Sequence, residues 1–66
     1  MLDAIGEAAG KVWKYLDAGG AQSIGRIQRE TGLSQSLTYL ALGWLAREGK
    51  IHFAQEGRVL QVSLAG

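Results

Sequence analysis

The hydrophobic pattern of the chain changes its period at Gly49, and this change limits the folds that the sequence can adopt. Before Gly49, apolar residues recur at steps of three and four, which is typical of amphipathic helices. After it, Ile51 and Phe53 alternate with outward-facing residues, and a similar alternation returns over residues 60–64. A period of two is typical of β-strands with one buried face. The sequence therefore predicts helices followed by two strands.

The first helix is predicted at residues 3–18, with one apolar stripe along it. The stripe consists of Leu2, Ile5, Ala9, Val12, Trp13 and Leu16. Gly6 and Gly10 lie one turn apart in this helix, and each costs about 1 kcal/mol relative to alanine. We expect another backbone to approach closely at these two glycines, which would offset the loss. The glycine pair at 19 and 20 ends the helix, because glycine readily takes the left-handed conformation there.

Two further helices are predicted on either side of a tight turn at residues 31–34. Ser23 caps the start of the second helix and Ser34 the start of the third, because a serine hydroxyl accepts a hydrogen bond from a first-turn N–H. Gly32 ends the second helix, and the third extends to Glu48. Two helices joined through so few residues have the spacing of a helix-turn-helix.

A three-stranded antiparallel sheet completes the predicted fold. Residues 55–58 contain Gly57 and form a short turn, so the two strands after Gly49 pair as a hairpin. The extended segment 21–23 supplies a third strand, and the inward side chains cover the helices. The predicted order is helix, strand, helix, helix, strand, strand, an α+β fold of three helices with a small antiparallel sheet. With 66 residues, the chain is expected to form one domain over 1–66.

The charge balance bears on the partners that the chain can bind. Seven basic and six acidic side chains give a net charge of +1 and a pI of about 8.2. Non-specific binding to nucleic acid depends on phosphate neutralisation, so one copy is expected to bind weakly and two copies more strongly. The chain has no cysteine, which excludes disulfides and thiolate metal sites and favours the cytoplasm. We expect neither a signal peptide nor a membrane span.

The sequence offers no set of residues for catalysis or for holding a metal or cofactor. His52 is the only histidine, and it faces outward on a strand without an acid at ligand spacing. Asp3 and Glu7 lie one turn apart, but acids near the start of a helix are the ordinary complement of its N-terminus. The glycines are dispersed and form no nucleotide-binding motif. We therefore expect no enzyme, no metal and no cofactor.

The element order and two sequence runs resemble the winged helix-turn-helix domain. The runs are TGLS at residues 31–34 and LGWLAREGKI at residues 42–51. More narrowly, the chain resembles a small stand-alone prokaryotic winged-helix family of unknown function, over residues 5–64. In the broader superfamily the third helix enters the major groove of DNA, and the hairpin, called the wing, touches phosphates or the minor groove. The resemblance therefore implies binding to double-stranded DNA.

The resemblance also implies which residues contact DNA. The first turns of the third helix present polar side chains that can hydrogen-bond to base edges or phosphates, and arginines on the second helix and beside the wing turn can hold phosphates. Further along the third helix, Leu40 and Gly43 offer no side-chain hydrogen bond. The sequence therefore offers more side chains that can hold phosphates of the DNA backbone than side chains that can read the bases. The candidate DNA-binding residues are Gln35, Ser36, Tyr39, Arg26, Arg29 and Arg58.

The apolar arc of the third helix admits two interpretations. The side that winged helices bury carries Thr38, Ala41, Leu42 and Leu45. The arc continues over Leu37, Leu40 and Trp44. Either the third helix is central and needs a broad buried surface, or these three residues and Trp13 form an exposed patch that a second copy or another partner covers. In the second interpretation all four are candidate interface residues.

Two functions follow from these interpretations. The first is a double-stranded DNA-binding protein that acts as a homodimer in transcriptional regulation or nucleoid association. The second is a protein-interaction or dimerisation module that uses a winged-helix scaffold without binding DNA. The resemblance favours the first function, whereas the near-neutral charge and the few polar residues of the third helix favour the second.

Overall fold

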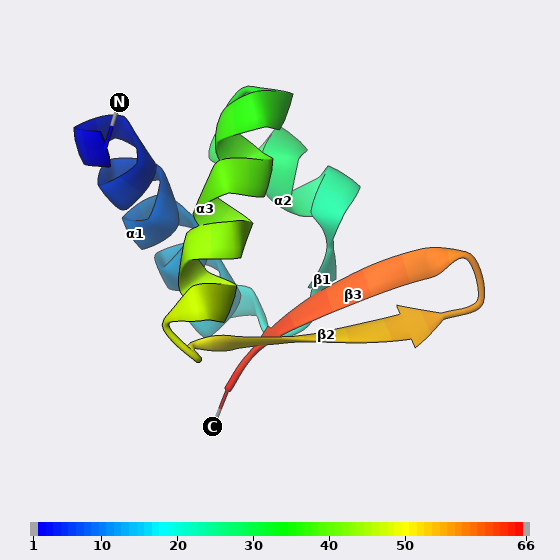
Figure 1. The fold of residues 1–66 in the computed structure, drawn as a ribbon. Helices are drawn as coiled ribbons and strands as arrows, with labels where there is room; N and C mark the ends of the chain where they lie inside the picture. The colour runs from blue at the N-terminus through cyan, green and yellow to red at the C-terminus, as the bar shows by residue number, and fades with distance from the viewer. Residues whose placement is uncertain (1, 66) are drawn as a thin grey trace.

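A computed structural model describes residues 2–65 of the chain and arranges them as three helices and three strands. The elements in chain order are α1 (Leu2–Gly19), β1 (Gln22–Ser23), α2 (Ile24–Thr31), α3 (Gln35–Arg47), β2 (Ile51–Glu56) and β3 (Val59–Leu64). The three helices contact one another, and in Figure 1 the β2–β3 hairpin projects from one end of them. This architecture confirms the fold predicted from the sequence.

Serine and glycine residues fix the ends of α2 and α3. Ser23 Oγ accepts a hydrogen bond from the backbone N–H of Arg26 at 3.2 Å. In the same way, Ser34 Oγ accepts one from the N–H of Leu37 at 3.1 Å. Gly32 ends α2 with a φ of 71°, in the left-handed region. Local hydrogen bonds and one glycine therefore set the turn that positions α3 relative to α2.

The sheet has the strand order β1-β3-β2, and both pairs are antiparallel. Gln22 of β1 pairs with Val62 of β3, which confirms that the segment before α2 supplies the third strand. A two-residue loop joins β2 to β3, since Glu56 pairs with Val59. Gly57 takes a φ of 63° in this loop, a conformation that tight hairpin turns need and that glycine adopts without strain.

The core lies around α3, which contacts α1, α2 and β2. Its buried apolar residues are Ala8, Ala9, Val12, Leu16, Ile27, Ala41, Leu42, Leu45, Ile51 and Val62. Thr38 is also fully buried, and its hydroxyl donates to the carbonyl oxygen of Ser34 at 2.8 Å. The side of α3 that the sequence predicts as buried is therefore the side that the other elements cover.

Some apolar residues predicted to face the core are exposed instead. Phe53 is 44% exposed, and Ile51 is the one residue of β2 that is buried. Phe53 pairs with the fully buried Val62 of β3, but β2 is an edge strand, and the helices cover the central strand β3 more fully than β2. In Figure 1 the turn end of the hairpin extends past the helices. On α1, Leu2, the first residue of the helix, is 74% exposed and Trp13 is 39% exposed, whereas Ala8 is buried in the core.

The prediction for Gly6 and Gly10 is wrong within a single copy of the chain. A Cβ atom built at either position meets no atom within 4 Å outside its own helix, among the residues that the structure describes. Both glycines are exposed, so this flank of α1 is open rather than packed against another backbone. Alanine would fit at both positions and would favour the helix by about 1 kcal/mol at each.

Candidate nucleic-acid interface

The start of α3 brings together the three residues predicted to contact bases. Because Ser34 caps the helix, Gln35 and Ser36 lie in its first turn, and Tyr39 follows one turn later. All three side chains are exposed, with 53% of Tyr39 accessible. Two hydroxyl groups and one amide therefore face solvent at one end of α3, where they can reach a ligand.

Two of the predicted phosphate-binding arginines lie on α2. Arg26 and Arg29 are both exposed and three residues apart, so they share one face of the helix. Arg29 lies in the last turn, where a cation also stabilises the negative end of the helix dipole. Arg58 is exposed in the hairpin turn, which lies apart from the helices in Figure 1. Arg26 and Arg29 thus lie on a helix that contacts α3, whereas Arg58 lies in the hairpin turn, separate from both helices.

The exposed surface of α3 has a polar side, formed by Gln35, Ser36 and Tyr39, and an apolar side, formed by Leu40 and Trp44. Tyr39 and Trp44 are five residues apart, so their side chains diverge by about 140° around a helix of 3.6 residues per turn. The apolar side borders α1, since Trp44 lines a hollow together with α1 residues.

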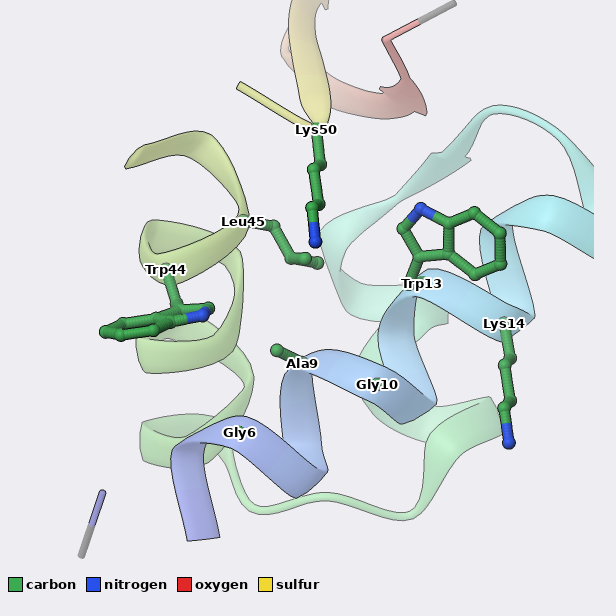
Figure 2. Close-up of a pocket in the computed structure, with 8 residues that line it drawn as sticks. All are labelled: Gly6, Ala9, Gly10, Trp13, Lys14, Trp44, Leu45 and Lys50. Carbon is green, nitrogen blue, oxygen red and sulfur yellow. The ribbon is translucent and has the colours of Figure 1, made fainter. Parts of the chain in front are cut away.

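The hollow between α1 and α3 has a volume of about 280 Å³. Its lining residues, drawn in Figure 2, are Gly6, Ala9, Gly10, Trp13, Lys14, Trp44, Leu45 and Lys50. In Figure 2 the Lys50 side chain points between Leu45 and Trp13, whereas Lys14 points away from the other residues. The hollow therefore has bare helix backbone and apolar side chains on its surface, with lysines beside them.

The exposed apolar residues agree with the patch interpretation for three of the four predicted positions. Leu40 and Trp44 are 44% and 47% exposed, and Trp13 is 39% exposed. Leu37 differs, because it is half-buried and packs against the core. Leu37 therefore contributes to the fold, and the interface role of the other three residues stays a prediction.

The sequence pattern does not identify the hollow between α1 and α3. A glycine pair indicates close approach of a backbone, but it does not tell whether that backbone belongs to the same copy of the chain. The available signal is the position of Trp13 three residues after Gly10, which puts a large apolar side chain on the same flank of the helix. Lys50 carries no comparable signal, because a lysine just after a helix also fits the helix dipole.

Among residues 2–65, no three metal-ligating side chains come together. Over the same range, none of the helices combines the length and the apolar character that crossing a membrane requires. Every buried side-chain nitrogen or oxygen atom in the described part of the chain has a hydrogen-bond partner. The groups that the surface presents to a ligand are hydroxyls, amides, cations and indole rings.

A sequence profile of the winged helix-turn-helix domain family DUF2582 matches residues 1–64. The chain belongs to this family. Its helix-turn-helix consists of α2 and α3, and the β2–β3 hairpin is the wing. The resemblance that the sequence runs at 31–34 and 42–51 indicated is therefore confirmed.

Proteins from an archaeon and a bacterium are similar to this winged-helix chain. The uncharacterised protein MJ1608 of Methanocaldococcus jannaschii is 36% identical over an alignment that covers 97% of this chain and 94% of that protein. The solution NMR structure of protein BT2368 from Bacteroides thetaiotaomicron has a TM-score of 0.86 and 35% identity, covering 94% of this chain and 76% of that one.

A second similar structure comes from a protein whose structure is described in terms of DNA recognition. The structure of HOP2, described for its DNA recognition and protein interaction domains and for homologous DNA pairing, has a TM-score of 0.70 and 30% identity. The match covers 88% of this chain and 98% of that chain. The winged helix of this chain is thus similar to one whose protein is described in terms of DNA recognition.

Proposed function

We propose that this winged-helix domain, formed by residues 1–66, binds double-stranded DNA through the polar side of α3 and the arginines of α2. The observation that carries the proposal is the open start of α3, where Gln35, Ser36 and Tyr39 are exposed beside the helix that presents Arg26 and Arg29. The similarity to HOP2 supports it, because that structure is described in terms of DNA recognition.

The residues have different roles in this proposal. Arg26 and Arg29 hold phosphates, and they fix the register of the domain on the duplex without reading its sequence. Gln35, Ser36 and Tyr39 face the major groove and hydrogen-bond to base edges or phosphates. Arg58 contacts a phosphate of the DNA backbone further along the duplex, where the wing reaches the DNA. Since Gly43 has no side chain and Leu40 is apolar, the domain binds many sequences with similar affinity.

We also propose that two copies act together. A net charge of +1 gives a single copy little electrostatic affinity, and a homodimer doubles the number of phosphate contacts. A cytoplasmic homodimer that binds DNA with low sequence preference suits nucleoid association, or transcriptional regulation where a preferred site exists. The proposal includes no catalytic step.

Equilibrium binding to a fluorescein-labelled random-sequence duplex tests this function. We expect binding that weakens linearly in log K as the logarithm of salt concentration rises between about 50 and 200 mM, because phosphate contacts release counterions. Fluorescence anisotropy measures the constant at each salt concentration. Absence of binding at the lowest salt concentration would contradict the proposal.

A second candidate function is a protein-interaction module that does not bind DNA. The specific observation in its favour is the exposure of Leu40, Trp44 and Trp13 around the hollow, because tryptophan is enriched at the centres of protein interfaces. The same anisotropy experiment separates the two candidates, since the second predicts no affinity for the duplex at any salt concentration.

A further inference from the structure

The flank of α1 that borders the hollow is built like half of an interface. Gly6 and Gly10 leave bare helix backbone at its floor, and Trp13 and Trp44 stand on either side (Figure 2). Both indoles are more than one-third exposed. Indole rings have a large apolar surface that is stabilised when another molecule covers it.

The two glycines have no use inside a single copy. Glycine destabilises a helix interior relative to alanine, and a Cβ atom at either position would meet no atom of residues 2–65 within 4 Å outside its own helix. Because the two glycines have no side chains, the backbone of a second molecule can come close to α1 at this point.

The charges of α1 identify a second copy of this chain as the molecule that fits. Asp3 and Glu7 lie in the first half of the helix, whereas Lys11, Lys14 and Asp17 lie in the second half, and all five are exposed. The first half therefore carries a charge of −2 and the second half a charge of +1. If two α1 helices pack antiparallel, the acidic half of each lies against the half of the other that carries the net charge of +1. Parallel packing would place like charges together. A two-fold symmetric dimer needs a surface that is complementary to itself, and this helix has one.

The glycines set the register of the pair. If Gly6 of one copy lies opposite Gly10 of the other, Asp3 lies opposite residue 13 and one position from Lys14. Asp3 and Lys14 are eleven residues apart, so they lie within about 20° of each other around the helix, on one edge of the flank. An antiparallel two-fold arrangement keeps that edge on the same side in both copies. Asp3 of each copy therefore meets Lys14 of the other.

We infer that a second copy of this chain covers the hollow, with the two α1 helices antiparallel, Gly6 opposite Gly10, and two symmetric Asp3–Lys14 ion pairs at one edge. The hollow lies on the apolar side of α3, so the polar side stays open for DNA. This inference rests on the proposed pairing of two copies, and it does not depend on DNA binding.

Charge reversal at one edge tests the arrangement. Sedimentation equilibrium of the parent protein should show a reversible dimer within the range of about 1 µM to 1 mM. Lys14→Asp and Asp3→Lys should each raise the dissociation constant by about tenfold or more, because each turns two attractive pairs into repulsive ones. The double variant Asp3→Lys, Lys14→Asp should return the constant to within about threefold of the parent value. A monomeric parent, or no recovery in the double variant, would overturn the inference.

Gly10→Leu provides a second variant that does not depend on the ion pairs. Leucine favours the helix, so thermal unfolding of the dilute protein should occur at the same or a higher temperature than for the parent, while the dimer is lost. A Gly10→Leu protein that dimerises like the parent would count against the close approach of the two helices.

Measurement of DNA binding on the same variants distinguishes this inference from the proposed function. A monomeric Gly10→Leu protein whose α2 and α3 amide resonances still shift when duplex is added supports both the dimer and the DNA function. A parent that binds duplex but sediments as a monomer overturns the dimer alone. A parent that dimerises as described but does not bind duplex overturns the DNA function alone.

Discussion

Replacement of Ile27 by alanine should lower the free energy of unfolding by about 2–4 kcal/mol, because it removes a buried side chain and leaves a cavity. Ile27 is the one fully buried residue of α2. Since folded domains are stable by about 5–15 kcal/mol and small ones lie near the lower limit, much of the protein should unfold at moderate temperature. Urea denaturation followed by tryptophan fluorescence measures the change.

Ile24→Ala is the matched control for this prediction. Ile24 lies on the same helix and has the same side chain, but it is half-buried against the core. Its loss should cost about 1–2 kcal/mol, since less apolar area leaves the core. Equal and small losses in the two variants would show that α2 is not held to the core through Ile27.

Replacement of both Arg26 and Arg29 by alanine should weaken binding to a random-sequence duplex by about one to two orders of magnitude at about 50 mM salt. The loss should be the same for every sequence, because phosphate contacts carry no base information. The slope of log K against log salt should become shallower by about two per protomer, since each phosphate contact contributes about 0.9. Fluorescence anisotropy over a salt series measures both quantities.

A Lys11→Ala, Arg47→Ala protein controls for the loss of two positive charges. Lys11 is exposed on α1, and Arg47 is exposed in the last turn of α3, as Arg29 is in the last turn of α2. We expect its salt slope to stay within about half a unit of the parent slope, because neither residue belongs to the proposed phosphate contacts. Equal slopes for the parent and the Arg26, Arg29 variant would remove both arginines from the interface.

The ends of the elements could be predicted from the sequence because local chemistry determines them. A serine hydroxyl caps a helix through a hydrogen bond to an N–H three residues later, as Ser23 and Ser34 do. Gly32 and Gly57 adopt the positive φ values that their turns need. These interactions involve neighbours in the chain, so the sequence states them directly.

Exposure of the apolar residues could not be predicted in the same way. Periodicity tells which side chains share a face, but not whether another element reaches far enough to cover that face. Phe53 continues the alternation of Ile51 and pairs with the buried Val62, yet it lies on an edge strand of the sheet and is 44% exposed. Trp13 belongs to the apolar stripe of α1, yet it lies at the edge of the contact with α3.

The same distinction applies to the candidate site, because local interactions determine one part of it and the packing of the elements determines the rest. The grouping of Gln35, Ser36 and Tyr39 follows from the helix cap, so their shared exposure at the start of α3 was predictable. The separation of Arg58 depends on how far the hairpin projects, and the hollow depends on the packing of α1 against α3. Both features depend on how the elements pack against one another in three dimensions, so no short run of sequence encodes them.

An NMR amide titration of the protein with a random-sequence duplex at low salt shows both whether the domain binds DNA and which residues contact it. We expect chemical-shift changes at Gln35, Ser36, Tyr39, Arg26 and Arg29 that fade as salt is added, since phosphate contacts are screened and counterions compete for them. Amides that do not move with excess duplex at low salt, or changes confined to the hollow around Trp13 and Trp44, would contradict the proposed function.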